Sequence, residues 1–307
     1  MEQNSIKTYM NYISDIPEFL YKYLDLDIIK RLKNIGYFCG MDYASKDIYN
    51  FKYNISRYDH SITTALLTYR FTKSKEETIA ALFHDISTPC FSHVIDYMNK
   101  DYETQESTEE KTESILKNSI KLKELLNIDN IDIKDISNFK QYSVVDNDRP
   151  KMCADRLDGI ILTSLAWTKS LNMKEIPNIL DNTIVYKNED EELEIGFKTE
   201  ILAQYIYELN DKIDIYCHTK EDIYMMELLA NITKYAIKNN YITYDDLYKL
   251  DEDKLFTILK RNTINDSYFN SLIHKFETID KNDIDNINLP KVKKRIINPL
   301  VNGMRLY

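Results

Sequence analysis

Residues 75–96 read KEETIAALFHDISTPCFSHVID, and this stretch carries the clearest information about the fold. Ser74 and Glu77 have the spacing of a capping box, which predicts a helix over 75–85 that begins beside them. The apolar run TIAALF indicates that this helix is buried up to its end. Pro89 interrupts the chain, so FSHVIDYMN is expected to form the next helix.

Helical patterns surround this stretch on both sides. Upstream, Asp15 has the character of an N-cap for a helix that stops at Gly36, and YDHSITTALLTYRFT predicts another over 58–72. Downstream, the segment KMCADRLDGIILTSLAW after Pro150 is expected to be a buried central helix. Further helices are expected over residues 101–125, 131–140, 199–215, 220–240 and 252–279.

One short segment departs from the helical pattern. NTIVYKNEDEELEIGF, over 182–197, alternates on both sides of a charged tip and predicts a β-hairpin. The tail LPKVKKRIINPLVNGMRLY is basic, contains two prolines and is expected to be extended. The predicted fold is therefore all-α, a mainly helical bundle with a small β-hairpin and an extended C-terminal tail. We expect a core over 1–180 and a helical extension over 181–307 packed on it.

The composition is typical of a globular protein. The chain has 307 residues, 43% of them hydrophobic, and its 24 Tyr and 11 Phe argue against a disordered coil. Only 5 Gly and 6 Pro favour long helices. The formal charge of −10 disfavours general binding to nucleic acid. No apolar signal region opens the chain, and no run reaches the ~20 apolar residues of a membrane span, so we expect a cytoplasmic protein without membrane contacts.

The five histidines are placed unevenly, and three lie between His60 and His93. His84 and Asp85 end an apolar helix, where a buried imidazole beside a buried carboxylate is costly unless something compensates both. A divalent metal would compensate them, and these ligand types suit Zn, Fe, Mn, Ni or Co. His60 and Asp155, on other predicted helices, are further candidate ligands.

Two further pairs of polar residues share a helix face at a spacing of three. They are His93 with Asp96, and Asp155 with Asp158. A carboxylate one turn away can orient an imidazole and raise its basicity, as a general acid or base requires. Taken singly, such residues are more often core histidines or paired charges; their order along the chain makes them candidates for a site.

This order resembles the metal-binding signature of the HD-domain phosphohydrolase superfamily. The segments RYDHS over 57–61, HDISTPCFSHVID over 84–96 and DRLDG over 155–159 are similar to the deoxynucleoside-triphosphate triphosphohydrolase branch. The tail INPLVNGMRL also resembles the strand-forming end of such proteins. The resemblance covers roughly residues 15–170 well and the rest of the chain loosely.

The resemblance implies a role for each motif residue. It implies a divalent transition metal (Mn, Fe, Zn, Ni or Co) or Mg, held by four ligands: His60, His84, Asp85 and Asp155. It implies three residues that act on the attacked phosphorus or on the leaving-group proton: His93, Asp96 and Glu109. It implies three residues that bind the substrate: Arg57, Arg156 and Asp158.

The expected function is metal-dependent hydrolysis of a nucleotide or related phosphoester, with a (d)NTP triphosphohydrolase as the nearest reaction. Three positions depart from the family pattern, where Thr88 replaces a histidine, Gly159 a tyrosine and Thr163 a sugar-contacting aspartate. They keep open a nucleoside monophosphatase or a cyclic-nucleotide phosphodiesterase. Thr88 also favours a non-catalytic nucleotide-binding regulatory module, whereas the complete set of ligands weighs against one.

A nucleic-acid-cleaving HD enzyme is a further alternative that the sequence disfavours. The net charge is negative, and no stripe of alternating aromatic and basic residues is present. The tail KVKKRIINPLVNGMRL is the only basic cluster, and it is equally typical of a solvated terminus, a site for a nucleotide regulator or a contact with a partner subunit. We expect a nucleotide or other small phosphorylated substrate, no nucleic acid and a homo-oligomer.

Overall fold

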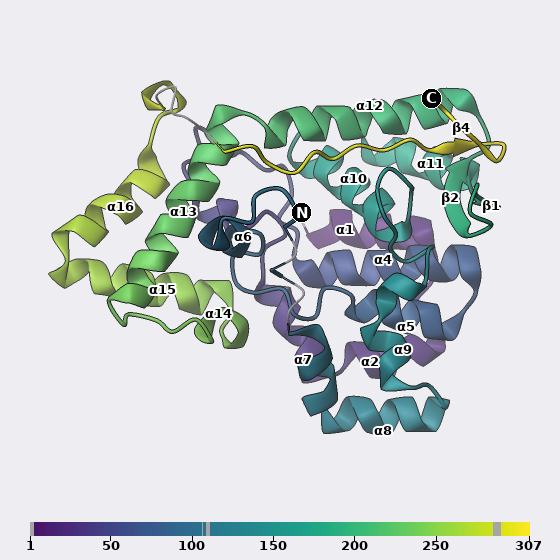
Figure 1. The fold of residues 1–307 in the computed structure, drawn as a ribbon, viewed down its shortest axis with the longest axis horizontal. Coiled ribbons are helices and arrows are strands. Elements are labelled where there is room, and N and C mark those ends of the chain that lie inside the picture. The colour runs from purple at the N-terminus through teal and green to yellow at the C-terminus, as the bar shows by residue number, and fades with distance from the viewer. Residues whose placement is uncertain (1–2, 106, 109–110, 285–289) are drawn as a thin grey trace.

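A computed structural model describes residues 3–105, 107–108, 111–284 and 290–307 (Figure 1). The first half of the chain is helical: α1 (Gln3–Ile13), α2 (Tyr21–Leu24), α3 (Asp27–Lys30), α4 (Arg57–Thr72), α5 (Lys75–Phe83), α6 (Val94–Asn99), α7 (Thr112–Asn118), α8 (Ile120–Asp129), α9 (Ile133–Ser137) and α10 (Ala154–Ala166).

The second half adds longer helices and one small sheet. Its helices are α11 (Ile176–Asn182), α12 (Glu200–Cys217), α13 (Lys220–Lys238), α14 (Asp246–Lys249), α15 (Glu252–Asn262) and α16 (Ser267–Thr278). Its strands are β1 (Thr183–Lys187), β2 (Leu193–Phe197), β3 (Leu300–Val301) and β4 (Met304–Arg305). The mainly helical fold with a small β-hairpin is confirmed.

Helix α4 is the centre of the fold, and it packs against α1, α5 and α10. Its start is set by a capping box: the Asp59 backbone N–H donates to Ser56 Oγ at 3.1 Å, and the Ser56 N–H donates to Asp59 Oδ2 at 2.9 Å. Helix α5 begins in a related way, because Ser74 Oγ accepts from the Glu77 N–H at 3.2 Å. These two caps fix where the histidines that follow them lie.

The single helix expected between Asp15 and Gly36 is wrong, because the chain there forms several short helical segments, among them α2 and α3. Leu26 separates α2 from α3 with an extended backbone, at φ −68° and ψ 139°. On one continuous helix the buried apolar side chains of this segment would point in every direction, so a straight helix could not bury them together. They are Leu20, Tyr23, Leu24, Leu26, Ile29, Leu32 and Ile35.

The helix expected over 101–125 is likewise shorter than predicted. The described residues before Thr112 are not helical, and Gln105 adopts a left-handed backbone with φ 55°. The Ser107 backbone N–H instead donates to Asp96 Oδ1 at 3.0 Å. A contact with a buried carboxylate from another helix has therefore replaced the helical hydrogen bond that the local charge pattern predicted.

The tail returns across the molecule and joins the sheet. In Figure 1 it runs, in yellow, alongside α12 toward β1 and β2. Strand β3 pairs in parallel with β2, with Gly196 opposite Leu300, where a Cβ on the glycine would lie 2.7 Å from the Leu300 carbonyl oxygen. Arg305 then binds the buried carboxylate of Glu194 at 2.6 Å. The tail is extended, as predicted, but much of it is packed rather than solvated.

Buried apolar side chains form one connected cluster that runs from Ile6 in α1 to Ile297 in the tail. It contains side chains from both halves of the chain, including Leu66 of α4 and Leu229 of α13. Among the residues that the structure describes, no helix is both long enough and apolar enough to pass through a membrane.

A buried carboxylate connects the C-terminal helices to the loops around the central helix. Glu252, the first residue of α15, is 2% exposed. Its Oε1 accepts from the Phe91 N–H at 2.8 Å, and its Oε2 accepts from the Gly36 N–H at 3.0 Å. Burial outweighs these hydrogen bonds and raises the pKa of Glu252 to about 8.

This raised pKa predicts how stability depends on pH. The folded state holds a proton on Glu252 up to about pH 8, whereas an unfolded glutamate loses it near 4.5. Ionisation therefore costs the folded state more as the pH rises through this window. We expect the advantage in melting temperature of wild type over Glu252→Gln to shrink between pH 5 and pH 8. A difference in melting temperature that stays constant between pH 5 and pH 8 would contradict this. Glu200→Gln, which changes an exposed glutamate, serves as the control.

Candidate metal centre

His60 lies in the first turn of α4 with both ring nitrogens engaged. Its Nδ1 is 2.7 Å from Asp158 Oδ2, which also accepts from Thr63 Oγ1 at 2.7 Å. The other oxygen of Asp158 accepts from the Tyr9 hydroxyl at 2.6 Å. Because a carboxylate can only accept, Nδ1 of His60 carries the proton. Its Nε2 faces the other way, toward Asp155 Oδ1 at 2.9 Å, on the side where a cation could bind.

His84 follows α5 and points its Nε2 at the same place. Its Nδ1 donates to the carbonyl of Ala81 at 2.7 Å, and its Nε2 lies 3.3 Å from Nε2 of His60. Asp155 Oδ1 lies 2.9 Å from the His60 Nε2 and 3.5 Å from the His84 Nε2. Two imidazole lone pairs and a carboxylate that face each other repel unless positive charge lies between them.

Asp85 is the fourth residue beside the converging side chains of His60, His84 and Asp155. Its Oδ2 lies 3.9 Å from the His60 Nε2 and 3.8 Å from the His84 Nε2. Arg57 holds it in place through a 2.9 Å ion pair. Burial alone would raise the pKa of Asp85, but the charges of Arg57, His84 and His60 together outweigh it and hold that pKa well below its usual range. Asp85 is therefore anionic at neutral pH.

The donor set fits a divalent metal ion. Ligand atoms about 2.0 to 2.2 Å from one ion lie roughly 3.0 to 3.5 Å from each other. The three distances among His60 Nε2, His84 Nε2 and Asp155 Oδ1 fall close to that range. Burial disfavours the His60 cation, but hydrogen bonds with Asp155 and Asp158 outweigh it and raise the pKa of His60 to about 10. The charges that attract this proton would also attract a metal ion.

His93 and Asp96 form a second pair at the same cavity. The ring of His93 lies directly before α6, and its Nδ1 is 2.9 Å from Asp96 Oδ2. Asp96 is fully buried, whereas the His93 side chain is 31% exposed. Phe91 and Ser92 turn the chain into this position with φ values of 65° and 44°. The carboxylate thus orients an imidazole whose other nitrogen is available to a ligand.

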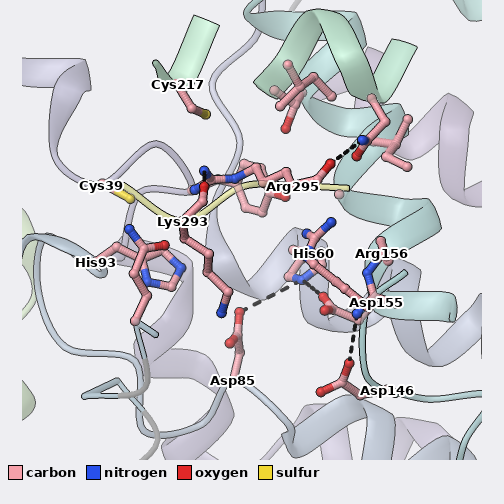
Figure 2. A pocket seen from close by; sticks show the side chains of 18 of the residues that line it. Cys39, His60, Asp85, His93, Asp146, Asp155, Arg156, Cys217, Lys293 and Arg295 are labelled. Atoms are coloured by element: carbon pink, nitrogen blue, oxygen red, sulfur yellow. Dashed lines mark hydrogen bonds and ion pairs between the residues drawn. The ribbon is translucent and has the colours of Figure 1, made fainter. Parts of the chain in front are cut away.

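These groups line one cavity of about 810 Å³ (Figure 2). The candidate metal ligands and Arg57 are on one part of its wall, and His93 is on another. Aromatic side chains line a further part: Tyr37, Phe38, Tyr49, Phe51 and Trp167. Phe38 and Phe51 are stacked, with ring centroids 4.1 Å apart. A cavity of this size can accommodate a drug-sized ligand.

The structure brings most of the predicted site residues together. Arg57 lines the cavity with its guanidinium paired to Asp85. Arg156 also lines it, and it donates to the side chain and the carbonyl of Asn147, at 2.7 Å each. Asp158, expected to bind substrate, instead lies fully buried behind His60.

Glu109 lies outside the described residues. Several cavity residues had no role in the sequence interpretation. Asp146, with Cys153 and Asp155, forms a second group with the geometry of a metal site, and Arg156 lies 3.7 Å from its carboxylate. Arg149 and Arg295 also line the cavity. The basic character of the tail was the one signal that could have drawn attention to Arg295.

Two comparisons with known proteins agree with this geometry. Residues 57–160 match the HD domain family, and HD domains bind divalent metals. The chain is 28% identical over 279 residues to uncharacterized protein YdhJ of Bacillus subtilis, covering 89% of this chain and 81% of that protein. It is 27% identical over 129 residues to metal-dependent phosphohydrolase cns2 of Cordyceps militaris, covering 42% of this chain and 36% of that protein.

The matched region contains all four candidate metal ligands, from His60 to Asp155. Together with the phosphohydrolase relative, it supports the HD superfamily and a metal-dependent hydrolase. The deoxynucleoside-triphosphate branch stays a prediction.

Proposed function

We propose that this protein is a metal-dependent phosphohydrolase whose substrate is a nucleotide or a related phosphoester. The observation that carries the proposal is the convergence of His60 Nε2, His84 Nε2 and Asp155 Oδ1 on one point of a large cavity, with Asp85 beside them. Imidazole and carboxylate ligands favour a divalent transition metal. We assign His60, His84, Asp85 and Asp155 as its ligands.

When bound there, such an ion acts as a Lewis acid toward a phosphoryl oxygen and makes water a better nucleophile. The protein's own residues do the rest. Arg57 holds Asp85 and carries positive charge at the cavity wall. Asp96 orients His93, and we propose that this imidazole gives a proton to the leaving oxygen. Asp158 keeps the proton of His60 on Nδ1 and so leaves Nε2 available.

The aromatic wall supports a substrate with a planar ring. Phe38 and Phe51 form a stacked pair, and Trp167 lies with its ring centroid 6.5 Å from that of Phe38. Aromatic side chains bind nucleobases by stacking with little regard to which base is present. This favours a nucleotide over a simple phosphorylated sugar or peptide.

The number of phosphates separates the proposed reactions. A (d)NTP triphosphohydrolase, the nearest by motif, releases tripolyphosphate; a nucleoside monophosphatase releases orthophosphate; and a cyclic-nucleotide phosphodiesterase opens the cyclic bond. We keep the first as the leading proposal and the other two as alternatives. A non-catalytic nucleotide-binding module would release none of these products.

The test combines elemental analysis with a substrate panel. The purified protein is expected to contain at least one transition-metal ion per chain. It is also expected to hydrolyse a nucleotide when Mn²⁺, Fe²⁺, Ni²⁺, Co²⁺, Zn²⁺ or Mg²⁺ is present. Products are separated by anion-exchange chromatography. Bound metal together with no turnover on nucleoside mono-, tri- and cyclic phosphates would contradict the proposal and favour a binding module.

A further inference from the structure

The C-terminal tail crosses the cavity that contains the candidate metal centre. Val292, Lys293 and Arg295 line this cavity together with the metal ligands. Figure 2 shows Arg295 and Lys293 on the tail, above His60 and Asp85. A segment more than 130 residues beyond Asp155 in sequence thus supplies part of the wall opposite the candidate ligands.

The tail is anchored by its backbone on both sides of the crossing. The Lys293 N–H donates to the Tyr102 carbonyl at 2.9 Å, and the Asn298 N–H donates to the Pro150 carbonyl at 2.8 Å. The Arg295 N–H donates to Asp214 Oδ1 at 2.6 Å, and its carbonyl accepts from the side chain of Asn210. These contacts hold the tail in place without using the Arg295 guanidinium.

Two arginines bring positive charge to this part of the cavity wall. In the described part of the chain, neither Arg149 nor Arg295 forms an ion pair. Arg149 donates to the Ile296 carbonyl at 3.2 Å, and Arg295 donates to the Lys293 carbonyl at 3.3 Å. Burial, with the charges of Arg156 and Arg295 nearby, lowers the pKa of Arg149 to about 10. Cationic groups therefore crowd one another at this wall.

Acidic groups act on these arginines without forming ion pairs with them: Asp222 on Arg295 and Asp155 on Arg149. Asp222 also lines the cavity, and it accepts from the Tyr49 hydroxyl at 2.6 Å. Burial raises the pKa of Asp222 to about 6, so its negative charge is itself disfavoured by its surroundings. Cys217 and Asp222 favour the charge of Arg295 and raise its pKa. Arg149 has no carboxylate ion-pair partner among the residues that the structure describes.

We propose that Arg295, with Arg149 beside it, binds a second anionic group of the substrate, apart from the phosphoryl group at the metal centre. The substrate class is then a compound with an oligophosphate chain rather than a single phosphate. This rests on the proposed function, because it places the scissile phosphoryl group at the four metal ligands. It makes Arg295 a specificity-determining residue that lies outside the matched HD region.

Charge and geometry both support this assignment. The chain carries a formal charge of −10, so it repels polyanions except where cations are concentrated. A guanidinium can donate two parallel hydrogen bonds to a phosphate, which gives geometric selectivity as well as affinity. The two arginines come from separate segments that meet at the cavity, so the anion site exists only when the tail is in place.

Calorimetric titration with inorganic tripolyphosphate and with orthophosphate tests the proposal. The protein is used with the metal that it retains on purification and with no free metal added. Arg295→Gln is expected to weaken tripolyphosphate binding about 10- to 100-fold, the loss typical of a hydrogen bond between charged groups, and orthophosphate binding by less than threefold. The tripolyphosphate affinity of Arg295→Lys should lie between those of Arg295→Gln and wild type.

The matched control is Lys294→Gln, which removes one positive charge from an exposed neighbouring residue. It should change tripolyphosphate affinity less than twofold. Equal losses in both variants would show a general charge effect and overturn the proposal, as would unchanged binding in Arg295→Gln. If Arg295→Gln has a lowered melting temperature, Arg149→Gln replaces it, with the same expected result.

The outcome separates this inference from the proposed function. Loss of tripolyphosphate binding in Arg295→Gln, in a protein that hydrolyses no phosphoester, would support the anion site and refute the phosphohydrolase. If wild type hydrolyses a nucleoside monophosphate and Arg295→Gln binds tripolyphosphate as tightly as wild type does, the phosphohydrolase is supported and the anion site is refuted.

Discussion

Replacing His84 with alanine is expected to reduce bound metal to background and to lower phosphoester turnover about 10³-fold or more. The reason is geometric: the His84 Nε2 lies 3.3 Å from the His60 Nε2 and 3.5 Å from Asp155 Oδ1, so it is one of three donors that converge on one point. Without this imidazole the site keeps only His60 and two carboxylates of its four assigned ligands, and it no longer encloses the ion. Losing about 4 kcal/mol of transition-state stabilisation corresponds to the stated factor.

Elemental analysis of the purified variant and a steady-state rate measure this effect. His274→Ala is the matched control, because it removes an exposed histidine on α16, outside the cavity lining. It should retain both metal and rate. His84→Ala with a full metal complement and an unchanged rate would refute the assignment of the metal centre. Its melting temperature should be compared with that of wild type from which the metal has been removed by chelation.

A change behind the metal centre is expected to have the second-largest effect. Asp158→Asn should weaken metal affinity about 10- to 100-fold while the protein stays folded. The carboxylate now accepts from His60 Nδ1, Thr63 and Tyr9. An amide can donate to Nδ1 instead, which would move the ring proton of His60 to Nε2, the nitrogen that faces the metal.

Competition with a chromogenic chelator measures this affinity. Tyr9→Phe is the control, because it removes one hydrogen bond from Asp158 without touching His60. It should change affinity less than Asp158→Asn does. Equal effects would show that Asp158 matters through local stability alone, and an unchanged affinity in Asp158→Asn would show that the tautomer of His60 is not set there.

The parts of the site that could be predicted are those with local patterns. His84 and Asp85 directly follow the apolar run of a helix that begins at a capping box. His93 and Asp96 are three residues apart on one predicted helix. These relations hold whatever the rest of the chain does. The same locality explains the successful prediction of the β-hairpin, whose strands are separated by five residues.

The parts that could not be predicted depend on long-range contacts. Asp158 shares a face with Asp155, which made a substrate role plausible, but α1 and α4 close around its carboxylate and bury it. Leu26 breaks the expected helix because its neighbours must be buried against different elements. Arg295 lies in an irregular tail, where no helical or strand period indicates which side chains point inward.

The crossing tail gives the order of biosynthesis a physical meaning. His60, His84, Asp85 and Asp155 all precede Arg295 in the chain, so the four assigned ligands are synthesised before the segment that supplies the last part of the cavity wall. Val292, Lys293 and Arg295 complete that wall, so a chain cut before residue 290 would keep the four assigned ligands and lose this part of the cavity lining.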